Sequence, residues 1–301
     1  MICNFRVAQT SLECNPRVAY VSGALRAPLD YRQQVDLNNV EVIDSPRHRA
    51  ELWPLRHGDA VLAGGTWLFS EPQPHLTRLV DLGGLGWPAV TRTDDGVELA
   101  ATCTIAEVSR LSAELGVPLL HQCCTALLAS FKIWHTATVG GNLCLSFPAG
   151  AMISMISALS GTVTVWRPDG TEYRCPVDEF VTGEATNVLA PGEIVRAVQL
   201  PAHALHARHA FRKLAPSPLG RSGVVVIGRH DADDRFVLSV SAATVRPYTF
   251  EFTGVPGPGE IRGAHAQIPD GAWTDDAHGD PDWRRAMTLV LATQVAAELA
   301  P

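Results

Sequence analysis

The chain has 301 residues, of which 46% are hydrophobic and 18% are charged, with a formal net charge of −7. This length allows two or three domains, and the apolar fraction supports buried cores and excludes a disordered chain. The negative net charge argues against a broad nucleic-acid-binding surface.

The first half of the chain begins without a clear pattern, so residues 1–35 are expected to form an N-terminal extension. DAVLAGG (59–65) and RLVDLGGL (78–85) predict strands that end in glycine turns, and VELAATCT (97–104) predicts another strand. TIAEVSRLSAELG (104–116) predicts a helix with Thr104 as N-cap, Glu107 completing a capping box and Gly116 as C-cap. HQCCTALLASF (121–131) predicts a second helix that leads into a Gly140–Gly141 turn.

The second half predicts further strands and helices in no regular alternation. MISMISALSG (152–161) is typical of a buried helix, TVTVWRPDGTEYRCPV (162–177) of a hairpin turning at Pro168–Gly170, and EIVRAVQLP (193–201) of a strand. Three more strands are expected in HAFRKLA (209–215), GVVVIGRH (223–230) and FVLSVSAATVRPYTFEF (236–252), followed by a loop at VPGPGEIRG (255–263). The final helix, 283–299, is expected to face inward with Trp283, Met287, Val290, Leu291 and Val295. The absence of strict strand–helix alternation predicts α+β domains.

The cysteines and the apolar stretches bear on location and metals. Seven cysteines at positions 3, 14, 103, 123, 124, 144 and 175 include no C-x-x-C pair, which predicts reduced thiols and no iron–sulfur cluster in this chain. The first fifteen residues contain no apolar signal-peptide core, and the most apolar stretch, 151–166, has 16 residues and is too short to span a bilayer. We therefore expect a cytoplasmic protein without a membrane span.

Two glycine pairs suggest a ligand site. VLAGGTWL (61–68) and ATVGGNL (137–143) each place an apolar run before Gly-Gly and a small polar residue. Glycine permits positive φ and close approach of a ligand, and successive N–H groups in such turns can converge on an anion such as a diphosphate. The alternative is that each pair only makes a tight turn. Neither pair matches the P-loop or the G-x-G-x-x-G pattern, which disfavours a Rossmann cofactor site.

The same residues resemble a known family. AGGTWL, then RLVDL, then ATVGGNL is similar to the FAD-binding medium subunit of molybdenum hydroxylases of the xanthine dehydrogenase and carbon monoxide dehydrogenase type. LAPGEIVRAVQLP (189–201), FRK (211–213) and HGDPDWRRAMTLVLATQV (278–295) extend the resemblance over residues 35–299. The family motif N-L-x-x-A-D-P-x-x-[DE]-L reads NLCLSFPAGAM here, so Phe147 and Ala151 replace polar or acidic residues.

The resemblance implies a fold, a cofactor and site residues. It implies a vanillyl-alcohol-oxidase-type (PCMH-type) FAD-binding fold of two α+β lobes at residues 36–201, with a small α+β C-terminal domain at 202–301. It places FAD between the lobes, with Lys213 near the flavin as a cation that favours the anionic reduced form; the alternative is a surface lysine. The expected diphosphate-binding residues are Ala63, Gly64, Gly65, Thr66 and Trp67 in the first motif and Thr138, Val139, Gly140, Gly141 and Asn142 in the second.

The resemblance also implies a role within a larger complex. In such a complex a large subunit holds molybdopterin, a small subunit holds [2Fe-2S] clusters, and the flavin passes electrons to an external acceptor. We accordingly predict neither catalytic nor metal-ligating residues on this chain. Two alternatives stay open: a flavin-free structural subunit of such a complex, in which Phe147 and Ala151 have removed FAD binding, and a stand-alone flavin oxidoreductase.

Overall fold

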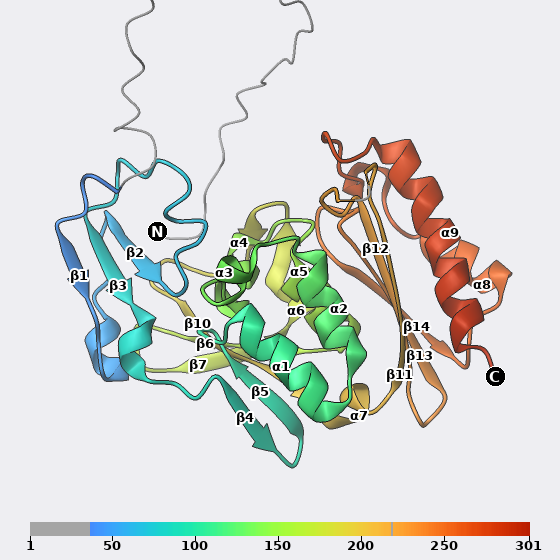
Figure 1. Cartoon of the computed structure of the whole chain (residues 1–301), viewed down its shortest axis with the longest axis horizontal. Coiled ribbons are helices and arrows are strands. Elements are labelled where there is room, and N and C mark those ends of the chain that lie inside the picture. Colours follow the sequence, from blue (N-terminus) through green and yellow to red (C-terminus); the bar gives the residue numbers. More distant parts are fainter. Residues whose placement is uncertain (1–36, 218) are drawn as a thin grey trace, which may run out of the picture.

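The structure, a computed structural model, describes residues 37–217 and 219–301. The N-terminal extension predicted for residues 1–35 lies outside the described residues. Figure 1 shows three parts in a row: a small sheet near the start of the chain, a central sheet with its helices, and a C-terminal sheet with its own helices. The domain boundaries predicted at residues 35 and 201 stay predictions.

The strands form three main sheets and one short hairpin. The first sheet is parallel, in the order β1–β3–β2, and comprises β1 (Val42–Asp44), β2 (Asp59–Leu62) and β3 (Arg78–Asp81). The central sheet is antiparallel, in the order β4–β5–β10–β6–β7, and comprises β4 (Val90–Thr93), β5 (Gly96–Ala100), β6 (Thr162–Trp166), β7 (Glu172–Pro176) and β10 (Ile194–Pro201). The C-terminal antiparallel sheet comprises β11 (Arg208–Leu214), β12 (Val224–His230), β13 (Arg235–Ser241) and β14 (Tyr248–Thr253). The short hairpin pairs β8 (Val181–Gly183) with β9 (Thr186–Asn187).

The helices gather between the central and C-terminal sheets and on the outer face of the latter (Figure 1). The inner set comprises α1 (Ile105–Leu115), α2 (Pro118–Ala126), α3 (Phe131–Trp134), α4 (Val139–Leu145), α5 (Ala151–Ala158), α6 (Val177–Phe180) and α7 (Ala202–Leu205). The outer set is α8 (Pro258–His265) and α9 (Pro281–Leu299). Three 3₁₀ turns, at Arg49–Leu52, Leu82–Leu85 and Asp270–Ala272, complete the described elements.

Helix α5 joins the central part to the C-terminal sheet. All eight of its residues are buried, as expected for the apolar segment 151–158. Its hydroxyl groups meet those of β13, with Ser154 Oγ 2.7 Å from Ser241 Oγ and Ser157 Oγ 3.1 Å from Ser239 Oγ. These paired hydroxyls satisfy polar groups that would otherwise be buried without partners.

Aromatic and arginine side chains hold the small first sheet against the central one. Trp53 Nε1 donates to the carbonyl oxygen of Gly192 at 2.7 Å. The Trp87 and Trp166 rings meet edge-on with their centroids 5.4 Å apart, and the Arg196 guanidinium lies 4.4 Å from the centre of the Trp87 ring. This packing fixes the position of the first glycine motif, which follows β2, relative to the second.

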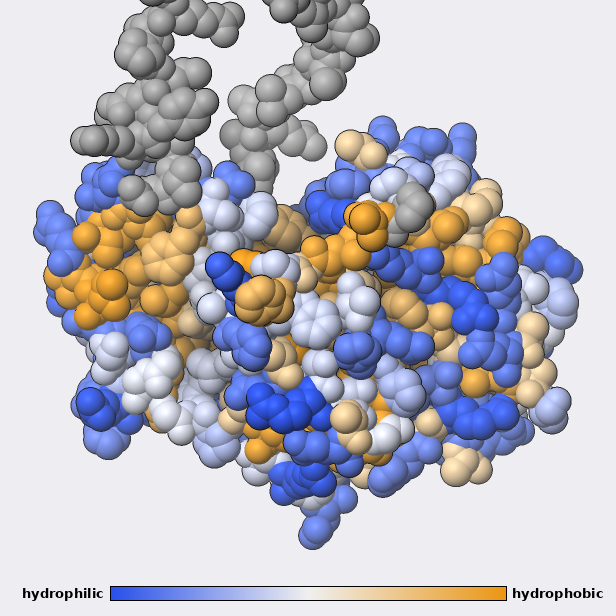
Figure 2. All heavy atoms as spheres, in the orientation of Figure 1, coloured by the Kyte–Doolittle hydropathy of each residue, from blue (hydrophilic) through white to orange (hydrophobic). Residues whose placement is uncertain are grey.

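One exposed feature of the first sheet is its edge strand. Val42 is 46% exposed and Ile43 is 61% exposed on β1, which lies at the edge of the sheet. Figure 2 shows hydrophobic residues gathered over this part of the molecule, at the left of the view.

Among the described residues, no helix is long and apolar enough to cross a membrane.

Several sequence predictions are confirmed at the level of local chemistry. Helix α1 has Thr104 as N-cap, the capping box with Glu107, and Gly116 as a left-handed C-cap. The hairpin of β6 and β7 turns where predicted, with Gly170 at φ +85°, and β10 ends at Pro201. Each of these features depends on residues close in sequence, which explains why the pattern predicts them.

Other predictions were wrong. The segment 236–252 forms two strands, β13 and β14, because the chain turns at residues 242–247. The predicted loop 255–263 contains helix α8, which Pro258 begins and Glu260 caps by accepting from Gly257 N. Val290, predicted to face inward on α9, is 44% exposed; the buried face instead includes Arg284, Thr288 and Ala292.

Two helix boundaries also differ. The second helix was predicted at residues 121–131, whereas α2 begins at Pro118 and ends at Ala126. It begins earlier because proline suits the first helical turn. The predicted Gly140–Gly141 turn is the first turn of helix α4. The two glycine pairs therefore occupy different kinds of backbone.

Candidate cofactor-binding site

The two glycine motifs lie against each other although more than 70 residues separate them in sequence. A Cβ atom added at Gly64 would lie 1.8 Å from the carbonyl oxygen of Thr136 and 3.2 Å from Cγ2 of Thr138. Glycine at position 64 thus permits backbone-to-backbone contact between the first motif and the segment that enters the second. The folded chain brings together the two sets of residues that the sequence suggested for one ligand.

The first motif is an open turn after β2. Gly65 has φ +69°, a left-handed conformation that favours glycine. Within residues 37–217 and 219–301, the backbone N–H groups of Gly64, Gly65 and Thr66 have no hydrogen-bond partner. Ala63, Gly64, Gly65 and Thr66 are only partly buried and Trp67 is 42% exposed, so these donors are accessible to an acceptor from outside the chain.

The second motif is the N-terminus of helix α4, and its donors are already engaged. Thr138 is the N-cap, and its Oγ1 accepts from Gly141 N at 3.1 Å. Val139 N and Gly140 N donate to the carbonyl oxygens of Cys103 and Ala101, and Asn142 N donates to Thr138 O. The two motifs are therefore not equivalent: the first offers backbone donors, whereas the second uses its own to fix α4 on the segment after β5.

The two glycines of the second motif have different surroundings. A Cβ at Gly140 would lie 2.6 Å from the Cβ of Ala101 and 2.8 Å from its carbonyl oxygen, so this glycine is needed for packing. A Cβ at Gly141 would meet only Thr138 Oγ1, at 3.1 Å. The space beside Gly141 is otherwise free of described atoms, so a ligand can approach α4 closely at this position.

Asn142 has a role that the sequence did not reveal. Its Oδ1 accepts from the backbone N–H of Met152 at 3.0 Å, so the side chain caps the start of α5 from α4. This bond fixes the orientation of the amide and leaves the Nδ2 group without a partner among the described residues. Nδ2 is a donor only, and it is therefore available to an acceptor atom of a ligand.

Phe147 connects the first motif to the C-terminal part of the chain. Its ring meets the ring of Trp67 edge-on, with centroids 4.9 Å apart, and the Arg221 guanidinium carbon lies 5.9 Å from the ring centre. Sequence comparison marked Phe147 as a departure from the family motif but did not point to Arg221, which lies in a Pro-, Ser- and Gly-containing loop. Ala151, the other departure, is buried at the start of α5.

Lys213 faces the central part of the molecule. It lies opposite Val225 of β12, which in turn lies opposite Ser241 of β13, and Ser241 contacts Ser154 of α5. Directly opposed residues share one face of a sheet, so Lys213 lies on the face that packs against α5. Burial lowers the pKa of the Lys213 ammonium. Among the described residues it forms no ion pair.

These features fit a diphosphate-containing cofactor. Three free backbone N–H groups at a left-handed glycine provide anion donors, Asn142 Nδ2 provides a fourth donor, and the free space at Gly141 permits close approach. The Trp67 indole offers an exposed aromatic surface beside them. Phe147 and Ala151 carry no polar group at the two positions where the family motif has polar or acidic residues. Contacts to hydroxyl groups of a ligand must therefore come from other residues.

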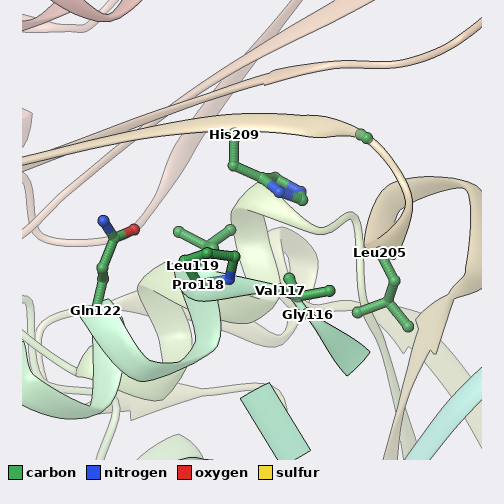
Figure 3. Close-up of a pocket in the computed structure, with 8 residues that line it drawn as sticks. Gly116, Val117, Pro118, Leu119, Gln122, Leu205 and His209 are labelled. Carbon is green, nitrogen blue, oxygen red and sulfur yellow. The ribbon is translucent and has the colours of Figure 1, made fainter. Parts of the chain in front are cut away.

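A separate cavity of about 310 Å³ lies between the α1–α2 connection and the start of β11. It is lined by Gly116, Val117, Pro118, Leu119, Gln122, Leu205, Ala207 and His209, with the His209 ring projecting over the helix start (Figure 3). His209 Nε2 donates to Ala204 O at 2.8 Å, and burial lowers the pKa of this imidazole. None of the predicted site residues lines this cavity.

Comparison with known proteins points to the part of the chain that contains both glycine motifs. Residues 46–203 match the sequence profile of the family described as "FAD binding domain in molybdopterin dehydrogenase". Over 99 residues the chain is 28% identical to the caffeine dehydrogenase subunit beta of Pseudomonas sp. (strain CBB1), and this match spans 33% of each chain. The aligned segment thus covers about a third of that relative's length.

Solved structures share the fold. The quinoline 2-oxidoreductase structure from Pseudomonas putida 86 superposes with a TM-score of 0.70 at 18% identity, covering 85% of this chain and 95% of that chain. Carbon monoxide dehydrogenase structures give TM-scores of 0.71 for Hydrogenophaga pseudoflava and 0.72 for Oligotropha carboxidovorans. Both are 18% identical and cover 86% of this chain and 96% of theirs. This architecture agrees with the PCMH-type FAD-binding fold expected from the sequence.

The family profile covers just over half of the chain and includes both glycine motifs, α4 and α5. The structural agreement extends beyond it to most of the chain. The protein therefore belongs to the family of FAD-binding domains of molybdopterin dehydrogenases.

Proposed function

We propose that the chain binds FAD with the diphosphate at the open turn of the first glycine motif, next to the start of α4. The observation that carries this proposal is the set of three unpartnered N–H groups at Gly64, Gly65 and Thr66, held in contact with the second motif. Asn142 Nδ2 adds a donor, and Gly141 leaves room for a phosphate oxygen. Hydrogen bonds to charged oxygens contribute about 1.5–3 kcal/mol each, so this set is sufficient to position a diphosphate.

The remaining residues act toward the two ends of the cofactor. Trp67 offers a face for stacking, and Lys213 lies on the sheet face that looks toward α5, where a flavin ring next to the C-terminal sheet would lie. When bound, FAD supplies two-electron and one-electron redox chemistry. The chain's own part is to bind the cofactor, hold it in one orientation and control which molecules reach it.

Within a complex, the chain would pass electrons from [2Fe-2S] clusters on a small partner subunit to an external acceptor. The substrate would be oxidised at a molybdopterin centre on a large partner subunit. Support comes from the family profile and from the curated relative, whose name marks it as a subunit of a dehydrogenase.

The direct test is the cofactor content of the purified chain. We expect a yellow protein with flavin absorbance, and we expect acid precipitation to release the flavin into the supernatant, where chromatography identifies FAD. Flavin that stays in the pellet would indicate a covalent link instead, with Cys144, just beyond the second motif, as the first residue to replace. Affinity purification from the source cells should recover molybdenum-containing and iron-containing chains; their absence would favour a stand-alone flavin oxidoreductase.

A flavin-free structural subunit is the second candidate function. It is favoured by Phe147 and Ala151, which place an aromatic ring and a methyl group where the family motif has polar or acidic groups. Colourless protein that does not bind added FAD, yet purifies with partner subunits, would establish this alternative.

A further inference from the structure

Two cations lie at one end of the β11–β12 hairpin. Lys213 is on β11, and Arg221 is in the loop that joins β11 to β12. The hairpin is closed by the pairing of Leu214 with Val224 and by a hydrogen bond from Gly223 N to Leu214 O at 2.9 Å. Both side chains therefore belong to the same end of the sheet.

This end of the hairpin is fixed against the candidate FAD site. The buried Arg284 guanidinium donates to Gly223 O at 2.6 Å and to Ala242 O at 2.7 Å, which ties the end of β13 to the end of the hairpin. Ala242 N in turn donates to Pro148 O at 2.9 Å. Arg221 thereby reaches the ring of Phe147, which contacts Trp67 of the first glycine motif.

Neither cation is neutralised by a carboxylate in the part of the chain that the structure describes. No ion pair involves Lys213 or Arg221, whereas Arg284, close by, is paired with Asp276. The adjacent loop carries Glu184, positioned by the hydrogen bond from Ala185 N to Ser146 O, but Glu184 forms no ion pair with either cation. In a chain with a net charge of −7, two unpaired cations at the edge of the site form a local positive region.

We propose that Lys213 and Arg221 recognise the electron acceptor and that the acceptor is a small molecule with anionic groups, such as phosphates. This inference rests on the proposed function and adds the chemical class of the acceptor to it. The contact of Arg221 is with the ring of Phe147, so we assign this cation to the acceptor and leave the diphosphate of FAD to the glycine motifs. The pair lies where the C-terminal sheet meets the candidate site.

Electrostatic steering gives this arrangement a measurable effect. Two cations at the mouth of a site raise the local concentration of anions and the association rate, and the effect decreases as salt screens the charges. The direction of the effect is set by the sign of the acceptor's charge. A cationic acceptor of the same size should be repelled.

Binding is tested with a redox-inert anion. Hexacyanocobaltate(III), a trianion of the size of ferricyanide, is titrated calorimetrically at low ionic strength into the FAD-loaded chain, into a Lys213→Gln/Arg221→Gln double variant and into an Arg262→Gln control. Arg262 is an exposed arginine on α8, on the outer face of the C-terminal part. The cation hexaamminecobalt(III) serves as the charge-reversed probe.

Electron transfer is tested on the same proteins. The bound flavin is reduced with dithionite without oxygen and mixed with ferricyanide; two ferricyanide ions take one electron each from the anionic reduced flavin, and its one proton goes to solvent. At low salt, we expect the double variant to bind hexacyanocobaltate roughly tenfold more weakly than the wild type. We also expect its reduced flavin to react with ferricyanide roughly tenfold more slowly. The Arg262→Gln control should match the wild type, and hexaamminecobalt should show no preference for the wild type.

The outcomes separate this inference from the proposed function. Equal hexacyanocobaltate binding by the wild type and the double variant, or an equal loss in Arg262→Gln, overturns the assignment of the two cations. A chain that purifies without FAD contradicts the proposed function instead, and the hexacyanocobaltate titration then still decides whether the cation pair binds anions.

Discussion

The two glycine motifs look alike in sequence and differ in the folded chain. In the first, Gly65 adopts a left-handed conformation and three consecutive N–H groups are free. In the second, both glycines lie in the first turn of α4, neither has positive φ, and every N–H from Val139 to Asn142 has a partner. A Gly-Gly pair therefore serves conformational freedom in one place and close packing in the other.

This difference gives the two motifs separate roles in the proposed FAD site. The open turn offers free backbone donors for a diphosphate, and the start of α4 offers a surface that a ligand can approach closely. Gly64 and Gly140 are required for contacts within the protein, whereas Gly141 faces free space. Substitutions at these positions should therefore separate effects on folding from effects on cofactor binding.

Gly64→Ala should have the largest effect, because it separates the two motifs. Its Cβ would lie 1.8 Å from a backbone carbonyl oxygen, which no side-chain movement can relieve. We expect a loss of about 3 kcal/mol in the free energy of unfolding, together with loss of FAD. Chemical denaturation measures the first and flavin absorbance the second. Gly271→Ala is the matched control, since Gly271, like Gly64, does not have positive φ but has no atom within 4 Å of the added Cβ, and it should change the free energy of unfolding by less than about 1 kcal/mol.

Gly141→Ala should give the clearest separation of folding from binding. Alanine is favoured over glycine in a helix by up to about 1 kcal/mol, and its Cβ meets only Thr138 Oγ1, at 3.1 Å, a contact that a small shift within the N-cap relieves. The variant should therefore be at least as stable as the wild type, yet bind FAD at least tenfold more weakly, because the methyl group occupies the ligand's side of α4. Gly263→Ala, in α8 with free space around its Cβ, should gain stability and keep FAD binding. Unchanged FAD affinity in Gly141→Ala would mean that the cofactor does not contact α4.

The sequence predicted those features that depend on neighbouring residues. The N-cap and capping box of α1, the hairpin at Gly170 and the end of β10 all follow from side chains within a few positions of each other. It also predicts that both glycine motifs belong to one site, and the fold brings the two motifs into contact. The sequence did not distinguish the open turn from the helix start. The start of α4 depends on hydrogen bonds from Val139 N and Gly140 N to residues 101–103, which are distant in sequence.

Long-range contacts account for the other differences. Nothing near Arg221 in sequence indicates that it reaches Phe147, since that contact depends on the anchoring of the hairpin by Arg284. The cap that Asn142 of α4 provides for α5 likewise depends on a contact between residues ten positions apart, and the loop between the two helices has no regular pattern that predicts it. Helix α8 was missed because its prolines and glycines are typical of loops, although proline at the first position and a capping glutamate also begin helices.

Asn142→Asp tests the donor that the second motif does offer. The carboxylate can still accept from Met152 N and has a favourable position at the N-terminus of α5, so stability should change by less than about 1 kcal/mol. The NH₂ donor is replaced by a negative charge, so FAD binding should weaken about tenfold. Asn187→Asp provides the contrast, because Nδ2 of Asn187 donates to Cys144 O and Ser146 Oγ and its loss should destabilise the fold. Equal FAD affinity in Asn142→Asp and the wild type would restrict Asn142 to its capping role.

Lys213→Met should have the smallest effect and extends the comparison to the flavin end of the site. Reduction places negative charge on the pyrimidine side of a flavin, so a nearby ammonium stabilises the reduced form more than the oxidised form. Two unit charges about 6 Å apart interact by roughly 3 kcal/mol at an effective dielectric constant of 20, and only part of this differs between the redox states. Methionine keeps the apolar stem and removes the charge, so FAD should stay bound while the midpoint potential decreases by roughly tens of millivolts.

The other lysine of the chain supplies the control for Lys213→Met. Lys132 is exposed on α3, shortly before the second glycine motif, and Lys132→Met removes the same charge away from the C-terminal sheet. Spectroelectrochemical titration of both variants should show a lower potential for Lys213→Met and an unchanged one for Lys132→Met. Lys213→Arg should restore part of the potential, because its planar guanidinium keeps the charge but cannot take the position of the ammonium. Equal potentials in all four proteins would return Lys213 to a surface lysine at the edge of the sheet, and the flavin would then lie away from it.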